Sequence, residues 1–409
     1  MVSETDATRS ARLAHAWSQL VDGSDAIADS ITLTLFERDV ELYERIGPEL
    51  RADVRASCRQ HIRRGLEILS GQSASGSAKE LWRETGRRRA RQGVPLELVL
   101  NAYTLGARVL WEALITHGSR AEGAAVDEGM LLSAARTVWA NLDVQSALLI
   151  DAYRRESRRL HRQDLQRQHA ALDALLEGRG ADPAYVEEAR AALDVGPDDG
   201  LACVTVLPGG QDHGADLDHT DRLGAVEDRL DRAGLRTHWH VRDGISFGLV
   251  CGDLPDEAGL VELLSPRAPA RIGVALSGDG LAGFATAYLL ATRAAQTLDR
   301  HDRRAVAVTD RLPEVLLVGS PQVGQLLVDQ ALGGLLAQPE SQRDSLLLTL
   351  AALLRHDGSP THAAADLFCH RNTVIYRLKQ IEALTGRSLG DPRDKMLLGL
   401  ALAAHGHEE

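Results

Sequence analysis

Apolar side chains recur every three or four residues through most of the first 177 positions. Leu13, Trp17 and Leu20 show this spacing, and the stretch 96–114 repeats it after Pro95. Such spacing puts apolar side chains on one face of an amphipathic helix. Stretches containing glycine or proline at 47–48, 71–76 and 93–95 separate the segments. The pattern predicts an N-terminal helical bundle over residues 1–177.

The run from Met130 to Glu177 contains neither glycine nor proline. A single helix of that length would span about 72 Å at 1.5 Å per residue, and we expect a break near Asn141 to Asp143. Toward the end of the run, apolar residues and a histidine alternate at spacings of four, three and four: Leu165, His169, Leu172 and Leu176. This pattern fits either a short two-stranded seam between copies or a helix that packs on its own domain.

From Gly178 the pattern changes to short apolar runs that alternate with helix-like segments. We predict strands at 202–207, 237–241, 245–251, 271–276 and 305–308, and helices at 220–233, 257–264 and 281–298. The Arg242-Asp243-Gly244 turn between two apolar runs indicates a hairpin. The order βαββαβαβ predicts an α/β domain over 178–338, ending in helix-like sequence from Pro313 to Ala337.

Residues 339–409 read as an all-α domain with clear helix boundaries. An apolar helix at 346–354 ends before Gly358, and Ser359-Pro360 begins a short helix. After a turn at 369–370 a longer helix runs to Gly386, and Asp391-Pro392 begins the last helix, which runs to about residue 404. A short helix, a tight turn and a second amphipathic helix form the helix-turn-helix pattern.

The second helix of this pattern has two distinct faces. Its inner face carries Val374, Leu378 and Ile381, together with Leu367 and Leu384, and small Ala364 and Ala365 would let the first helix approach closely. The opposite face carries Asn372, Tyr376 and Lys379. Hydrogen-bonding residues therefore gather toward the start of the second helix, where a recognition helix meets base edges.

Each of these polar residues suits a particular contact with a duplex. Arg371 is the first candidate for a base contact, because a bidentate guanidinium on guanine is the commonest specific pairing, and Asn372 could read adenine. The remaining candidates would contact phosphate or sugar: His370, Thr373, Tyr376, Arg377 and Lys379. The alternative is an ordinary helical hairpin with a solvated basic face.

The overall charge weighs against a nucleic-acid partner, but its distribution does not. The net charge is −12, whereas phosphate contacts need lysine and arginine. Between residues 368 and 381, however, there are three basic side chains and no acidic one. The aromatic share of 4% leaves cores built mainly from leucine, valine and alanine, which favours helices.

The remaining composition argues against several classes of protein. Neither a secretory signal nor an apolar run long enough to span a bilayer is visible, so we expect a cytoplasmic protein without membrane contact. The four cysteines form no CxxC pair. His238 and His240 could be two metal ligands on one strand face, but without a third ligand a polar face is the simpler interpretation. We predict no metal, no cofactor and no enzymatic activity.

Two further groups of side chains have more than one interpretation. The aromatic residues of the helical region could line a pocket for a small effector or simply form its core: Trp82, Tyr103, Trp111 and Trp139. The arginines at 87, 88, 89 and 91 could bind DNA or an anionic ligand, or form a solvated helix end.

The motif at the second helix resembles a known family. The run His370-Arg-Asn-Thr-Val-Ile-Tyr-Arg-Leu-Lys-Gln-Ile-Glu382, followed by Leu384-Thr-Gly386 and Asp391-Pro392, is similar to the C-terminal helix-turn-helix of PucR/CdaR-type bacterial transcription regulators. One departure is Ala363-Ala364, where the family commonly has Thr-Ala. The stretch Gly93 to Trp111 resembles the N-terminal domain of RsbR-type stress regulators.

The middle region looks like the degenerate GGDEF-like domain of the same regulators. At the hairpin where a cyclase would carry its acidic motif, this chain has Val241-Arg-Asp-Gly-Ile245. The acidic pair that holds metal ions against a nucleoside triphosphate is absent, so the resemblance does not imply cyclase activity.

Taken together, the resemblance implies a multidomain α plus α/β regulator that binds double-stranded DNA. One helix reads few base pairs, so a homodimer or a higher even oligomer on half-sites about 34 Å apart is expected, with a small-molecule effector acting through the N-terminal or middle domain. The alternative is a signalling scaffold whose N-terminal domain docks a partner and whose C-terminal domain is structural.

Overall fold

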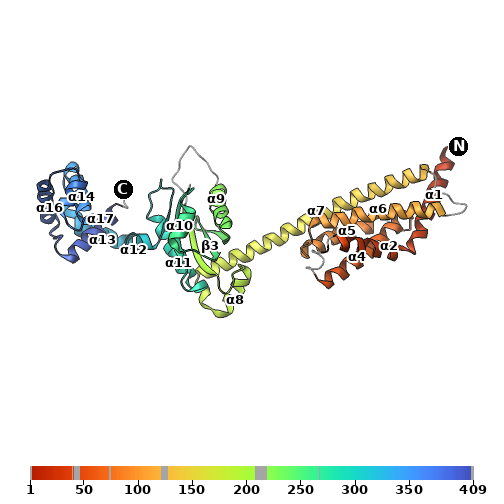
Figure 1. The fold of residues 1–409 in the computed structure, drawn as a ribbon, viewed down its shortest axis with the longest axis horizontal. Coiled ribbons are helices and arrows are strands. Elements are labelled where there is room, and N and C mark those ends of the chain that lie inside the picture. The colour runs from red at the N-terminus through yellow and green to blue at the C-terminus, as the bar shows by residue number, and fades with distance from the viewer. Residues whose placement is uncertain are drawn as a thin grey trace. The chain divides into compact units, whose positions relative to one another are not determined.

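The computed structural model describes residues 2–38, 40, 47–72, 75–120, 128–207, 219–266 and 268–406. The chain divides into two compact units, Met1–Leu165 and Gln166–Glu409, and the division falls inside one helix, α7 (Glu128–Leu176). Along the chain, helices are followed by a small sheet with its own helices and then by helices again (Figure 1). The predicted class, multidomain α plus α/β, is confirmed.

The first unit is a helical bundle in its described residues. Trp17, Ile31, Leu66 and Leu114 are fully or almost fully buried and belong to one apolar core, to which the start of α7 adds Val138. The helices that precede α7 are α1 (Val2–Val21), α2 (Ser24–Arg38), α4 (Pro48–Leu69), α5 (Ser75–Arg91) and α6 (Leu96–Arg120).

One described segment, Leu96–Thr116 in α6, is long and apolar enough to cross a membrane, contrary to the expectation from the sequence. The core helix of a folded domain meets the same test. Leu105, Leu110 and Leu114 of this segment are buried in the bundle core. About a third of the segment is buried inside the protein, so packing accounts for part of its apolar character.

The helix α7 is continuous, so the expected break near Asn141 to Asp143 is wrong. The run contains no glycine or proline to interrupt the backbone hydrogen bonds. Packing supports it at both ends, because Leu149 is buried in the first unit and Leu172 in the second. Leu172 and the partly buried Leu176 pack on the sheet and helices of the middle region, and not on the N-terminal bundle to which the sequence prediction assigned them, whereas Leu165 is exposed.

The middle region is an α/β domain with the predicted order βαββαβαβ. Its mixed sheet has the strand order β2-β3-β1-β4-β5, in which only the β4–β5 pair is parallel. The strands are β1 (Gly200–Leu207), β2 (Arg236–Arg242), β3 (Ile245–Gly252), β4 (Arg271–Leu276) and β5 (Ala305–Ala307).

Helices cover both faces of this sheet. One face packs against the end of α7, α8 (Pro183–Ala192) and α11 (Phe284–Gln296), and the other against α9 (His219–Arg232) and α10 (Glu257–Leu264). Strand β1 alternates between them, with Cys203 toward the first face and Val204 toward the second. Short 3-10 turns lie at η1 (Arg179–Ala181), η2 (Gly280–Gly283) and η3 (Thr309–Arg311). Helix α8 is an addition to the sequence prediction.

The C-terminal helices share a separate core. Leu332, Leu350, Ile381 and Leu398 are buried together. Because Leu332 lies in α13, this core includes residues on the N-terminal side of the predicted boundary at 338/339. The helices are α12 (Leu312–Val318), α13 (Pro321–Leu336), α14 (Glu340–Arg355), α15 (Pro360–Asp366), α16 (Arg371–Thr385) and α17 (Pro392–His405). Pro321 ends the continuity of the helix-like stretch that we predicted at 313–337.

Candidate nucleic-acid interface

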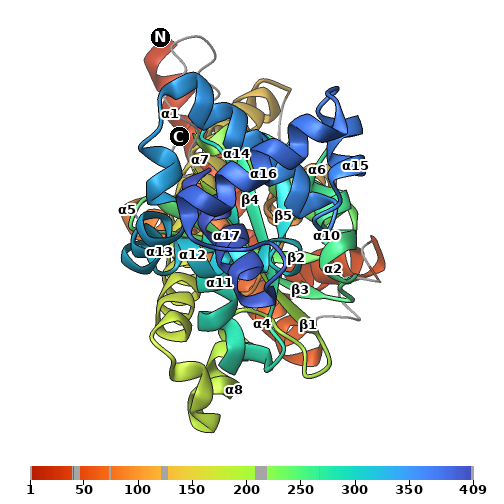
Figure 2. The ribbon, with the colours of Figure 1, turned by 90° about the vertical axis from the view of Figure 1, so that its left-hand side faces the viewer.

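The helices α14, α15 and α16 pack as a helix-turn-helix unit (Figure 2). Ala363 and Ala364 of α15 are buried against Val374 of α16. Ala365 is exposed, so the second small residue at this contact is Ala363 and not, as expected, Ala365. Positions 363, 364 and 367 share one face of a helix, whereas position 365 lies on another.

The start of α16 is fixed by a local side-chain contact. His370 stands at the N-cap with extended backbone, and its Nδ1 accepts a hydrogen bond from the backbone N–H of Asn372 over 3.2 Å. This contact satisfies one of the N–H groups that a helix start leaves without a partner. At the other end, Gly386 adopts φ 66°, the left-handed conformation that ends many helices. His370 therefore has a structural role besides any contact with a ligand.

The outer face of α16 is exposed in the part of the chain that the structure describes. Five of the seven predicted contact residues are exposed: His370, Arg371, Asn372, Tyr376 and Lys379. Within the described residues, Arg371 and Lys379 form no ion pair, and Tyr376 accepts a hydrogen bond from Gln380 Nε2 at 3.3 Å. Two cations without an internal counter-charge thus lie on one exposed helix face.

The other two predicted residues are partly buried. Arg377 Nη1 donates to Thr349 Oγ1 of α14 over 3.3 Å, while that hydroxyl donates its own proton to the carbonyl of Ser345. The guanidinium of Arg377 is therefore directed at α14, away from the exposed face. Thr373 lies in the first turn of α16 and retains partial exposure.

Phe368 is a residue of this surface that the sequence reasoning missed. Its side chain is 97% exposed, and its φ of 51° lies in the left-handed region that bulky residues rarely adopt. The hydrogen bonds of Phe368 and Cys369 back to Ala365 and Ala364 close α15 in a pattern that usually places glycine at this position. A strained, fully exposed aromatic ring directly before α16 is a signal for contact with a partner.

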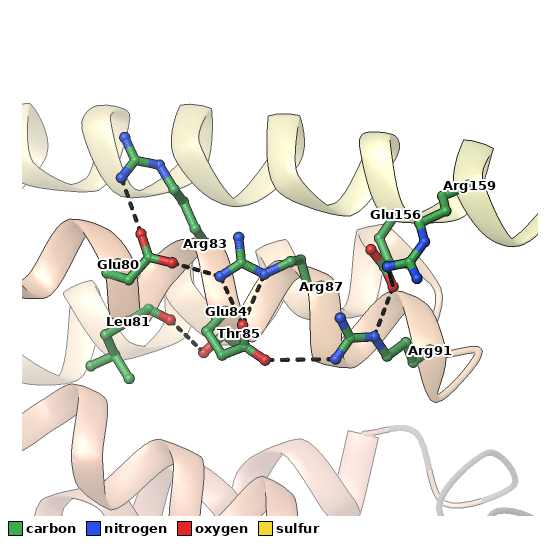
Figure 3. Close-up of polar contacts among 9 residues, drawn as sticks. All are labelled: Glu80, Leu81, Arg83, Glu84, Thr85, Arg87, Arg91, Glu156 and Arg159. Atoms are coloured by element: carbon green, nitrogen blue, oxygen red, sulfur yellow. Dashed lines mark hydrogen bonds and ion pairs between the residues drawn. The ribbon is translucent and has the colours of Figure 1, made fainter.

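The arginines of α5 are engaged within the chain. Arg91 joins α5 to the buried Glu156 of α7 at 2.7 Å, and Arg87 lies between Glu80 and Glu84 (Figure 3). Arg88 and Arg89 pair with Asp53 of α4. Arg89 is 4% exposed, so this cluster is neither a free surface for DNA nor, at Arg89, a solvated helix end.

The four aromatic residues proposed for an effector pocket have different environments. Trp82 and Tyr103 line a cavity of about 120 Å³ in the first unit. Trp111 is partly buried and packs against the bundle core, and Trp139 is 48% exposed. The structure therefore brings two of the four to a common cavity.

The hairpin of the middle domain carries a tight turn. Asp243 and Gly244 have φ values of 52° and 77°, as a two-residue hairpin turn requires. On β2, His240 Nε2 lies 3.2 Å from Asp173 Oδ2 of α7, so this histidine packs against the connector helix. Among the described residues, no three histidine, cysteine or acidic side chains are grouped so as to hold a metal ion.

Comparison with known proteins adds three family matches. The model of the RsbT co-antagonist protein rsbRD N-terminal domain matches residues 25–168. The GGDEF-like domain matches residues 177–297, and the PucR C-terminal helix-turn-helix domain matches residues 346–404.

Individual relatives share parts of the chain. The purine catabolism regulatory protein of Bacillus subtilis is 46% identical over 67 residues, which are 16% of this chain and 13% of that protein. The carbohydrate diacid regulator of Escherichia coli is 50% identical over 54 residues, 13% of this chain and 14% of that protein. An uncharacterized protein of Mycobacterium tuberculosis is 30% identical over 203 residues, 48% of this chain and 47% of that protein. The chain thus spans less than half the length of these curated relatives.

Proposed function

The chain carries the three domains of a PucR/CdaR-type regulator, namely an RsbRD-type N-terminal domain, a GGDEF-like domain and a PucR-type helix-turn-helix domain, and from this premise we propose that it is a sequence-specific DNA-binding transcriptional regulator. The partner it binds is double-stranded DNA, and it performs no enzymatic reaction. It acts in the cytoplasm, in response to an effector bound by the N-terminal or middle domain.

The exposed outer face of α16 carries this proposal. Arg371 and Asn372 lie in the first turn of α16, where the helix dipole favours an approaching phosphate and where recognition helices present side chains to base edges. Lys379 lies two turns further on the same exposed face. A surface with two unpaired cations and an amide suits a major groove, which is lined by acceptors and flanked by phosphates.

One recognition helix reads too few base pairs to give useful affinity for DNA, so a second copy of the chain is required. A homodimer, or a higher even oligomer, would place two α16 helices on half-sites about 34 Å apart. An effector changes DNA affinity only if it binds the two arrangements of these helices with different affinity. The continuous α7 has buried residues in both units and could therefore transmit a change at an effector site in the first unit to the second unit.

A binding titration with the full chain tests this proposal directly. Fluorescence anisotropy of a labelled duplex from the region upstream of the protein's own gene is measured at a stated salt concentration, against a scrambled duplex of equal length. We expect a preference for the upstream duplex of at least about 10³-fold. Equal binding of the two duplexes, or no binding to either, would contradict the proposal and favour a scaffold role.

Replacing Lys379 with alanine should weaken binding to all duplexes about equally. Its ammonium is a candidate phosphate contact, and each contact with phosphate releases condensed counterions. The slope of log K against log salt should therefore fall by about one. Anisotropy titrations at four salt concentrations measure this slope, and a slope identical to that of the wild type would exclude Lys379 from the phosphate contacts.

Replacing Phe368 with glycine should weaken DNA binding without destabilising the C-terminal domain. Glycine adopts φ 51° without strain, so we expect the thermal stability of the C-terminal domain to be kept or raised. Loss of the exposed ring should weaken cognate DNA binding by about fivefold, equivalent to roughly 1 kcal/mol of apolar contact. Unchanged DNA affinity in a folded variant would show that the ring does not contact the duplex.

A further inference from the structure

The first unit contains a cavity of about 120 Å³, partly open to solvent, whose walls are mostly apolar. Ile31, Ile62, Val99 and Leu110 contribute aliphatic side chains, and Trp82 contributes its ring. A dry apolar cavity of about 150 Å³ holds a molecule the size of benzene. The space therefore suits a ligand of about five to seven non-hydrogen atoms.

A hydrogen-bonded group of polar side chains lies at the cavity wall. His61 Nε2 is 2.8 Å from Thr85 Oγ1, and that hydroxyl donates its proton to the carbonyl of Leu81. Thr85 must then accept the proton of Nε2, so Nδ1 is the unprotonated nitrogen when the ring is neutral. Burial, and then the charges of Arg88 and Arg89, lower the pKa of His61 to about 3, so the ring stays neutral at physiological pH.

Tyr103 offers a donor to this cavity. Its hydroxyl oxygen lies 3.2 Å from Nε2 and 3.4 Å from Nδ1 of His61, and the two rings meet edge to face. The Nε2 proton is already given to Thr85, and a donation to Nδ1 at 3.4 Å is long. Tyr103 also has a side-chain hydrogen bond with Thr85, and a carboxylate inside the cavity would be a stronger acceptor for the phenol proton than either neutral partner.

The same wall carries more positive than negative charge. Arg89 lines the cavity, is 4% exposed and donates to Asp53, Gln92 and Ser57. Among the described residues these bonds use three of its five N–H groups. Arg88 pairs with the same Asp53, so two guanidinium groups share one carboxylate. Arg88 does not line the cavity, but Arg89 does, and no acidic side chain is among the lining residues; the wall therefore favours an anion.

We propose that this cavity binds a short-chain aliphatic monocarboxylate, with its carboxylate toward Tyr103 and Arg89 and its alkyl group among the aliphatic side chains. A carboxylate accepts from both the phenol and the guanidinium, with the geometry that arginine prefers. A cation would meet the guanidinium of Arg89 with no acidic side chain among the lining residues, and a phosphate ester with a large body would exceed the space. Binding itself is independent of the proposed function, and only its effect on transcription rests on it.

The position of the cavity connects ligand binding to α7. Trp82 and Thr85 of α5 and Asn141 and Gln145 of α7 line it together. The same two helices are joined by the ion pair of Arg91 with Glu156 (Figure 3). A ligand between α5 and α7 therefore contacts the helix that continues into the second unit.

Isothermal titration of the full-length protein tests the proposal with two matched probes. Isobutyrate and isobutyramide have nearly the same shape and differ in charge, and both are titrated up to 20 mM at constant ionic strength. We expect isobutyrate to bind and the amide to bind at least about tenfold more weakly, because hydrogen bonds to a charged acceptor are stronger than those to a neutral one. Equal binding of the two probes, or no binding of isobutyrate, overturns the proposal.

Three variants locate the binding. Tyr103→Phe keeps the ring and should lower isobutyrate affinity by about tenfold. Gly106→Ala adds a methyl group that meets Ile62 Cδ1 at 3.6 Å, an ordinary contact, so the variant should fold with a smaller cavity and bind more weakly. Trp139→Phe is the control, because Trp139 is exposed outside the cavity. Wild-type affinity in both cavity variants, with thermal melting confirming that they fold, would overturn the proposal.

The DNA titration is carried out separately on the same preparations. If isobutyrate binds at the cavity but no duplex is bound with preference, the proposed function fails and the ligand assignment stands. If a duplex is bound with preference but isobutyrate is not bound, the ligand assignment fails and the proposed function stands.

Discussion

Replacing Arg371 with alanine is expected to weaken binding to the cognate duplex by about 1 to 3 kcal/mol and to relax the base preference at one position. Arg371 is exposed in the first turn of α16, and within the described residues no acidic side chain pairs with it. Its five N–H groups are therefore ready for bidentate contact with guanine without first breaking an internal bond. Anisotropy titrations on the cognate duplex and on duplexes with single base changes measure both effects.

A matched control separates base recognition from the loss of charge. Arg232→Ala removes one exposed cation from α9 of the middle domain, where the side chain bonds to the carbonyl of Asp228. This variant should keep both affinity and base preference. If Arg371→Ala behaves like Arg232→Ala, or loses affinity equally on every duplex, Arg371 is not a base reader.

The helix-turn-helix could be predicted in detail because its helix ends are set by neighbouring residues. Pro360 at the start of α15, His370 before α16 and Asp391 before α17 act within a turn of their own position. The strands and helices of the middle domain could also be predicted, because each is marked by the apolar pattern of its own residues. Helix α8 also has such a local signal, an Asp182 side chain that accepts from the N–H of Ala184, but the helix is only ten residues long and carries only two large apolar side chains, Tyr185 and Val186.

Features that depend on distant parts of the chain could not be predicted in this way. The absence of glycine and proline permits an unbroken α7, but the packing of its residues in two different units, which stabilises it, has no local signal at 141–143. Likewise, the sequence does not distinguish Arg89 from the other arginines of its polar helix. Its burial depends on α4, which places Asp53 and Ser57 within hydrogen-bond distance of it. The exposure of Phe368 runs against its apolar character and follows from the turn geometry.

Acidification from pH 7 to pH 5 is expected to destabilise the helical bundle by about 2 kcal/mol through His61 alone. Burial is the main cause that lowers its pKa to about 3 in the folded protein, whereas an unfolded histidine titrates near 6.5. Below pH 6.5 the unfolded chain takes up a proton that the folded protein does not. The free energy of unfolding therefore falls by about 1.4 kcal/mol per pH unit, from about pH 6.5 down to about pH 3.

Hydrogen exchange of peptides from α4, α5 and α6 in the full-length protein measures this local free energy at each pH. His61→Gln retains an N–H donor for Thr85 but does not titrate. Between pH 7 and pH 5 the opening free energy of this variant should therefore fall by about 2 kcal/mol less than that of the wild type. His15→Gln, at an exposed position of α1, serves as the control and should retain the wild-type dependence. If His61→Gln and the wild type lose protection in parallel, the ring is not held neutral by its burial.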